Sequence, residues 1–400
     1  MPNTTRISRR SLAPWRESTS NPLPTSPSDT RRQGLGSAQI QEHLRFGPSV
    51  LAYLPPSQEW NLPMFAVSLR HAVALTSLVF ACSAHATSFD CSSAASKTEK
   101  AICADPYLSR LDDKLADQWR ITLGNVADPQ ILKTDQRQWL KNRNACGGLS
   151  ACLRREYLMR VTELEHAVKP FSWDATWQLI PPGTSTSATL VTQRRDATHI
   201  DIDISAGEGA NSGDLTGVAI LKDGTAVYAR DACTLTFTPI NGVLNVTQTG
   251  ADFDCGGGMG VYYAGRYVAS VQPLQLNYDL LSLGLARTPA EDQALRSLLK
   301  TDYQKLVETS GSLQVGEASK DVPDAQVSEM WMRGLGGIGI LMSTADAQVW
   351  LIFKSYDDRG KEHLRYYTNA KQWKRQLPDV LQAWYERFKS NQTLELEFMP

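Results

Sequence analysis

The sequence has few histidines, and the residues that would build a familiar hydrolytic site are missing. Only six of its 400 residues are His, and three of these, His166, His199 and His363, follow residue 86 in separate parts of the chain. There is no G-x-S-x-G string and no H-E-x-x-H string. A hydrolase needs a nucleophile with a base, a metal, or paired acids in a cleft. We therefore expect no enzymatic activity, and leave the question open for residues 271–400 alone.

Long hydrophobic runs are also lacking, and the apolar run at 72–81 has the features of an export signal. From Met64 a short charged segment with Arg70 leads into an apolar run at 72–81, then into the triplet Ala84-His85-Ala86. This order is typical of a signal peptide over 64–86, cleaved after Ala86. The run is too short to span a bilayer, so we expect no transmembrane helix in the mature chain. A lipid anchor at Cys82 is the less favoured alternative, because Phe80 is large for a lipoprotein box.

Residues 1–63 have no sustained apolar period and are rich in Ser, Pro, Thr and Arg. Such a composition cannot bury a core. We expect that translation starts at Met64. The alternative is that residues 1–63 are translated and form a disordered leader. The mature protein is then periplasmic or secreted in a bacterium.

Strong charge of either sign is absent, which limits the partners. The whole chain has a net charge of −1, while residues 87–400 hold 33 Lys and Arg against 38 Asp and Glu, a net of about −5. Mild acidity argues against a nucleic-acid partner and favours a cationic one. The string Gly334–Gly339 fits G-x-G-x-x-G, but a strand pattern follows it where a dinucleotide site needs a helix. We expect a glycine-rich turn there and no cofactor.

Cysteines are few but even in number once the signal is removed. The six that remain are Cys91, Cys103, Cys146, Cys152, Cys233 and Cys255. An even number in an oxidising compartment predicts three disulfides. Cys233 pairs most naturally with Cys255 within one β-rich region, whereas the other four can pair as neighbours or crosswise. Gaps of eleven and five residues do not suit a zinc site, so we expect no metal.

Periodicity divides the mature chain into three parts, which together predict a multidomain α+β protein. Residues 87–168 have helical spacing throughout, with Asp-Pro helix starts at Asp105 and Asp128, and predict a disulfide-stapled helical bundle. Residues 172–270 change to a period of two with hairpin signals at Asp223-Gly224 and Asn241-Gly242. Seven or eight short antiparallel strands, the last of them over 260–268, predict a β barrel or sandwich.

The third part, residues 271–400, predicts an α+β module. A capping box at Thr288-Pro289-Ala290-Glu291 opens a helix that continues to Leu306. Strand-like runs follow at 338–343, 349–353 and 365–367. A final helix is expected over 370–388, with a kink or restart at Pro378.

Residues 87–168 carry a set of motifs at fixed offsets. They are F-D-C from Phe89, I-C at Ile102, P-x-L-S-x-L-D from Pro106, Q-x-x-W-L-x-x-R-x-x-C from Gln136 and C-L-x-x-x-Y-x-x-R from Cys152. This part of the chain resembles the lysozyme inhibitor LprI N-terminal family, although Trp119 stands where the family is expected to place Tyr. The resemblance implies an exported bacterial protein and, for at least one branch, inhibition of lysozyme.

Six residues are candidates for contact with a partner. Asp112 and Arg143 are polar positions of the helical motifs, and the alternative for them is an ion pair or cap that fixes helix packing. Gly257, Tyr262, Tyr263 and Arg266 lie in or after the string Cys255–Gly260. This string predicts either a tight bend beside a disulfide or a flexible loop that enters a partner's cleft, since Tyr and Arg are enriched at such contacts.

Two functions fit these observations. The first is binding and inhibition of a lysozyme-type peptidoglycan-degrading enzyme, suggested by the resemblance, the export signal and the acidity. The second is a structural or ligand-binding envelope protein in which the helical module is an accessory, suggested by the residues that the resemblance does not cover.

Overall fold

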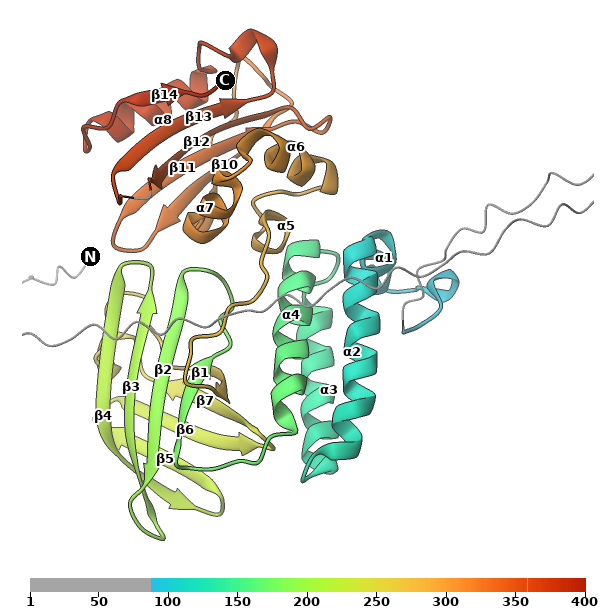
Figure 1. The fold of residues 1–400 in the computed structure, drawn as a ribbon, viewed down its shortest axis with the longest axis vertical. Helices are drawn as coiled ribbons and strands as arrows, with labels where there is room; N and C mark the ends of the chain where they lie inside the picture. Colours follow the sequence, from blue (N-terminus) through green and yellow to red (C-terminus); the bar gives the residue numbers. More distant parts are fainter. Residues whose placement is uncertain (1–87, 358) are drawn as a thin grey trace, which may run out of the picture. The chain divides into compact units, whose positions relative to one another are not determined.

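The structure is a computed structural model that describes residues 88–400, apart from residue 358. The expected leader over 1–63, the signal peptide over 64–86 and the alternative anchor at Cys82 lie outside these described residues. The described chain is a mixed α+β protein with helices first, then a β barrel, then a second sheet with helices (Figure 1). Within it, no helix combines the length and apolar character needed to cross a membrane.

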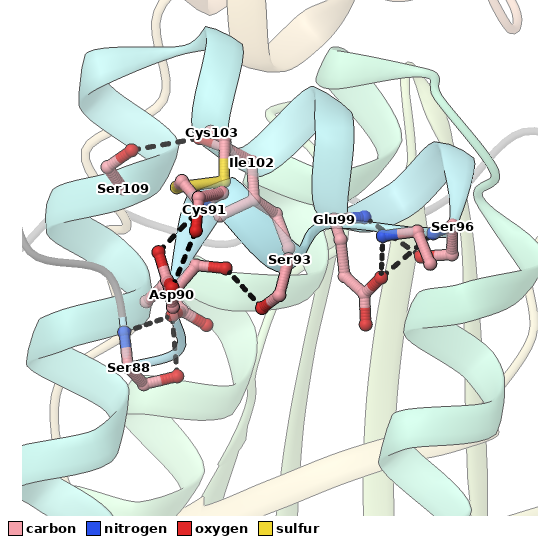
Figure 2. The surroundings of a disulfide bond; sticks show 12 residues. Ser88, Asp90, Cys91, Ser93, Ser96, Glu99, Ile102, Cys103 and Ser109 are labelled. Carbon is pink, nitrogen blue, oxygen red and sulfur yellow. Dashed lines mark hydrogen bonds between the residues drawn. A yellow bond between two sulfur atoms is a disulfide. The ribbon is translucent and has the colours of Figure 1, made fainter.

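Four α-helices make up the first part of the described chain, which we call the helical region (residues 88–168). They are α1 (Lys97–Ala104), α2 (Pro106–Asn125), α3 (Pro129–Ala145) and α4 (Ser150–Ala167), preceded by the short helix η1 (Cys91–Ser93). The Asp-Pro starts are where the sequence predicts them: the side chains of Asp105 and Asp128 each accept two backbone N–H groups of the following turn. Helix α1 opens with a capping box between Ser96 and Glu99 (Figure 2).

Three disulfides join the six expected cysteines. They are Cys91–Cys103, which ties η1 to α1 (Figure 2), Cys146–Cys152, which bridges the α3–α4 turn, and Cys233–Cys255 in the barrel. The sequence left two kinds of pairing open for the first four cysteines, and the structure has the pairing between neighbours. Each bridge lies within one region and none links two regions.

The predicted barrel or sandwich is a closed barrel of eight antiparallel strands (Figure 1). The strands are β1 (Ala175–Leu179), β2 (Thr186–Arg194), β3 (His199–Glu208), β4 (Asn211–Lys222), β5 (Thr225–Arg230), β6 (Cys233–Ile240), β7 (Val243–Thr249) and β8 (Gly265–Ala269). Closure is made by β1 and β8, where Trp177 lies opposite Ala269. Alternate residues point inward, and the buried core includes Trp177, Phe237 and Tyr267.

The last strand of the barrel is shorter than the sequence pattern predicts. Strand β8 pairs with β1 and β7 through residues of Gly265–Ala269 only, and residues 260–264 are not part of the strand. Gly256 and Gly260 adopt left-handed φ values of 82° and 79°, and the N–H of Gly258 donates to the carbonyl of Ser212 on β4. The glycines fold this segment back on the barrel before the strand can begin.

The C-terminal part contains a six-stranded sheet with the order β14-β13-β12-β11-β10-β9. Its strands are β9 (Ser312–Val315), β10 (Gln326–Met332), β11 (Gly336–Ser343), β12 (Val349–Tyr356), β13 (Glu362–Thr368) and β14 (Leu396–Phe398), and its helices are α5 (Leu280–Leu283), α6 (Pro289–Leu299), α7 (Asp302–Thr309), η3 (Lys371–Trp373) and α8 (Asp379–Lys389). Alternate residues of β12 pack on α5–α7 on one face and on α8 on the other. The sheet is therefore buried on both faces.

Two predicted helices of this part are interrupted. The helix that starts after Thr288 breaks between α6 and α7, where Lys300 has a φ of +52° that no helix allows. The final helix begins at Asp379, directly after Pro378, because proline cannot donate within a helix but is tolerated at its start. The string Gly334–Gly339 lies in the β10–β11 turn and the first half of β11, as a glycine-rich turn followed by a strand.

Candidate functional site

A cavity of about 400 Å³ lies where the helical region meets the barrel, and we call it the junction cavity. Helices α3 and α4 contribute one wall and strands β1, β2, β3 and β8 contribute the other. The lining residues are Trp139, Asn142, Glu156, Met159, Glu163, Leu179, Ile180, Pro182, Thr186, Gly207, Glu208, Gly260, Tyr262, Ala264, Gly265 and Arg266. A volume of this size suits a small ligand or a single protein side chain.

The β6–β7 hairpin fixes the helical region against the barrel. The N–H of Gly242 donates to the carbonyl of Ala167 at 3.0 Å, and the Asn241 side chain exchanges hydrogen bonds with the backbone of Asp128 at 2.8 and 3.1 Å. A Cβ at position 242 would come within 2.5 Å of the carbonyl oxygens of His166 and Lys169. Only glycine permits this approach, so the Asn-Gly turn also docks α4.

A buried charge network joins the same two regions beside the cavity. Arg160, 1% exposed, donates to Asp135 at 2.6 Å and to Glu163 at 2.5 Å, and it also bonds Gln136. Arg266 of β8 donates from Nη2 to the other oxygen of Asp135 at 2.5 Å. We call these five residues the Arg160 network. Burial opposes ionisation of Asp135, but Arg160 and Arg266 outweigh it and hold the pKa of this carboxyl below its usual value.

The three carboxylates that line the junction cavity differ in their partners. Glu163 is paired with Arg160, and Glu208 accepts hydrogen bonds from Ser185 at 2.9 Å and Thr186 at 2.6 Å. Glu156 has no ion pair or hydrogen bond from its carboxylate to any residue that the structure describes. Burial, and then the negative charge of Glu163, raise its pKa above the usual value. The charge of Arg155 lowers this pKa, but less than burial and Glu163 raise it, so Glu156 is a half-buried acid without an ion pair among the described residues.

Aromatic and aliphatic side chains supply much of the remaining wall. Trp139 packs edge-on against Tyr157, and its indole N–H donates to the backbone carbonyl of Glu156 at 3.4 Å. Tyr262, 48% exposed, stands on the barrel side of the cavity. Met159 of α4 and Ile180 after β1 add apolar surface.

The predicted candidates Asp112 and Arg143 meet through a tyrosine in the helical interior. The hydroxyl of Tyr157 donates to Asp112 at 2.6 Å and accepts from Arg143 at 3.1 Å, while Ser88 donates to Asp112 from its backbone and its side chain. Burial, and then the charge of Asp112, raise the pKa of Tyr157 far above its usual range. Asp112 is 2% exposed, so its contacts fix helix packing.

The other candidates lie on a loop that we call the glycine loop (residues 252–262) or follow it. The N–H of Gly260 donates to Asp252 at 2.5 Å, and the Asn211 amide donates to the carbonyl of Met259 at 2.8 Å. A Cβ on Gly257 would lie 2.5 Å from the carbonyl of Val261. With the Cys233–Cys255 bridge at its base, the loop is a tied-down bend.

Three side chains of the glycine loop are exposed, whereas the residue that follows it is buried. Tyr263 is fully buried in the barrel core, whereas Phe253 and Met259 are each 75% exposed and Tyr262 is 48% exposed. The loop thus presents three apolar or aromatic side chains on a fixed backbone. Tyr262 and Arg266 are the two predicted candidates that the fold brings to the junction cavity.

The three histidines of the described chain are each held by a neighbour. Nδ1 of His166 lies 2.9 Å from the carbonyl of Thr162, Nδ1 of His199 lies 3.0 Å from Asp196, and Nδ1 of His363 lies 2.7 Å from Glu397. They lie in three different parts of the fold. Among residues 88–400 apart from 358, no group of three or more His, Cys, Asp or Glu side chains is placed to hold a metal ion.

Sequence reasoning missed most of the residues that line the cavity. Glu156, Met159 and Glu208 are not among the six candidates that the sequence offers. The burial of Arg154, Arg160 and Glu163 on helix α4 is seen only in the structure, because charged residues are buried only when paired and the partners are distant in sequence.

The chain was compared with protein-family models, curated proteins and solved structures, and none of them matches. The resemblance of residues 87–168 to the LprI N-terminal family therefore remains a proposal.

Proposed function

We propose that this chain is an exported bacterial envelope protein that binds and inhibits a lysozyme-type peptidoglycan-degrading enzyme. Three disulfides support a periplasmic or secreted location, because such bonds persist in oxidising compartments. In this proposal residues 87–168 are a disulfide-stapled helical bundle of the LprI N-terminal type, and the barrel presents the contact surface.

The observation that carries the proposal is the glycine loop. Phe253, Met259 and Tyr262 are exposed on a backbone that a disulfide and hydrogen bonds hold in place. A preorganised loop loses little entropy when it binds, so its apolar side chains contribute most of their burial energy to affinity. The net charge of about −5 on residues 87–400 adds long-range attraction to a cationic enzyme.

A lysozyme turbidity assay tests this function. The full chain, expressed with its own export segment and purified from the periplasm, is titrated against lysozyme acting on cell walls. We expect inhibition that weakens at least tenfold in the double variant Phe253→Ser, Met259→Ser. Val315→Ser is the matched control, because Val315 is 95% exposed on β9 of the other sheet. No inhibition by the unchanged protein at large molar excess would contradict the proposal.

A second function, ligand binding in the envelope with the helical module as an accessory, is favoured by the junction cavity. Its walls come from two regions, so a ligand there would hold both. Under this alternative the protein binds a small molecule and does not inhibit lysozyme in the turbidity assay. A thermal-shift screen of small ligands against the same preparation separates the two functions.

A further inference from the structure

The junction cavity combines apolar walls with two acids, Glu156 and Glu208, that form no ion pair with the described residues, and Glu156 also lacks hydrogen bonds to its carboxylate. Met159, Leu179 and Ile180 can cover an aliphatic group, and Trp139 and Tyr262 offer aromatic surface. The cavity volume of about 400 Å³ is at the low end of the range for ligand sites. A long, thin group with one charged end matches this lining better than a bulky polar molecule.

The charges that line the cavity do not cancel. Arg266 already binds Asp135 through Nη2, and its Nη1 is buried without a hydrogen-bond partner among the described residues. Besides the junction cavity, Arg266 lines a second cavity of about 10 Å³. A space of that size corresponds to about one water molecule. Glu163 is neutralised by Arg160, while Glu156 lines the cavity without an ion pair to a described residue. The charge of Arg155 also acts on Glu156, but more weakly than burial and Glu163. The wall is therefore acidic toward a ligand.

An anionic ligand is disfavoured by the same geometry. It would meet the carboxylates of Glu156 and Glu208, while the charge of Arg266 is already balanced by Asp135 at 2.5 Å. A ligand without charge would leave Glu156 half-buried and unpaired, which costs free energy that a cation would recover.

We propose that the junction cavity binds an organic cation, an ammonium or guanidinium on an aliphatic stem, with Glu156 as its counter-ion. The stem lies along Met159 and Ile180, and the ring of Tyr262 adds attraction for the positive charge. Trp139 contributes apolar surface only, because the guanidinium of Arg143 already lies over its ring at 5.5 Å. This inference rests on the proposed binding function and names the chemistry of its ligand. A Lys or Arg side chain of a cationic protein partner and a free alkyl amine share that chemistry.

Calorimetric titration of the full periplasmic protein with four capped amino acids tests the ligand class. The probes are the N-acetyl amides of lysine, arginine, norleucine and glutamate, which differ mainly in the end of the side chain. We expect lysine or arginine to bind at least tenfold more tightly than norleucine, and glutamate to bind most weakly. Equal binding of lysine and norleucine, preferred binding of glutamate, or no binding of lysine and arginine would each overturn the inference.

The variant Glu156→Gln locates the counter-ion. It keeps the shape of the side chain and should lower the affinity for the lysine probe at least tenfold. Glu165→Gln is the matched control, because Glu165 lies on the same helix but is exposed and paired with Lys114. Unchanged affinity in Glu156→Gln, with both variants folded by circular dichroism, would overturn the assignment.

The same preparations in the turbidity assay separate this inference from the proposed function. Inhibition that weakens in Glu156→Gln and is relieved by the lysine probe supports the inference and identifies a partner's basic side chain as the cation. Binding of the probe without any inhibition of lysozyme supports the inference with a free amine as the source, and it contradicts the lysozyme function. Inhibition without probe binding and without an effect of Glu156→Gln overturns the inference alone.

Discussion

The helical region and the barrel fill their interiors with different kinds of side chain. Around α4 the buried residues include Arg154, Arg160 and Asp135, whose ion pairs and hydrogen bonds reach other helices and the barrel. The barrel core is apolar except for a few polar groups such as Thr192, which accepts a hydrogen bond from the indole of Trp177 at 2.8 Å. Two adjoining parts of one chain are thus stabilised in two ways.

The backbone explains the difference. Each helix satisfies its hydrogen bonds internally, so side chains alone decide how helices pack on each other. In the closed barrel the strand ladder fixes the neighbours, and an apolar interior suffices. In the helical region buried ion pairs therefore supplement an apolar core, whereas the barrel interior is almost wholly apolar.

The largest expected effect on the stability of the helical region comes from removing Arg160, the central cation of the Arg160 network. Arg160→Leu would leave Asp135 and Glu163 buried next to each other without their shared partner. Loss of one member of a buried ion pair costs about 3–5 kcal/mol. We expect a decrease of that size in the free energy of unfolding, measured with urea. Arg137→Leu on α3 is the control, since Arg137 is exposed and should change stability little. A small effect of Arg160→Leu would mean that these charges do not hold the helices.

The disulfides sharpen the comparison between the two regions. Cys233–Cys255 closes a loop with a sequence separation of 22 and Cys146–Cys152 one of 6, so the barrel bridge restricts the unfolded chain more. Replacing Cys233 and Cys255 by Ala should lower the free energy of unfolding by about 3 kcal/mol. Replacing Cys146 and Cys152 by Ala should lower it by about 2 kcal/mol. Urea titration under identical buffer conditions measures both. The reverse order would show that native contacts, rather than chain entropy, dominate the effect.

The smallest expected effect concerns Glu156 and depends on pH. Its pKa is raised in the folded protein by burial and by Glu163, against a weaker opposing effect of Arg155. Ionisation therefore destabilises the fold, and this cost is absent below the unfolded pKa and grows as pH rises through the folded pKa. Glu156→Gln should match the unchanged protein at pH 4 and be more stable at pH 7, by less than about 1 kcal/mol because solvent screens the site.

Melting temperatures of the two proteins at several pH values measure this difference, and other titrating groups cancel because both proteins contain them. A Glu156→Gln variant that is less stable at pH 7 would mean that the carboxylate has a stabilising partner.

Local sequence signals predicted much of the fold. Asp105 and Asp128 start helices because their side chains cap the first turn. The hairpins form where the sequence predicts them, with positive φ at Asp223, Gly224 and Asn241. The break at Lys300 had no such signal, since lysine rarely adopts a φ of +52° and only the surrounding packing imposes it.

The candidate site was harder to predict, because its two walls are distant in sequence. Tyr262 and Arg266 were identified by residue type, but Glu156 lies about a hundred residues earlier on α4 and becomes part of the site only when the Asn241-Gly242 turn docks that helix. Asp112 was chosen from a sequence motif, but it lies in the interior and accepts a hydrogen bond from Tyr157, so it contributes to packing and not to the site. Long-range docking is not encoded in any short motif.

The closure of the barrel also has a consequence for the order in which the chain can fold. Trp177 of β1 pairs with Ala269 of β8, so the ladder is complete only after the whole segment between them is available for pairing. The bridges Cys91–Cys103 and Cys146–Cys152 span short segments and need no part of the barrel. The first part of the chain can thus be cross-linked while the barrel is still open, and α4 then offers a finished surface on which the Asn241-Gly242 turn settles.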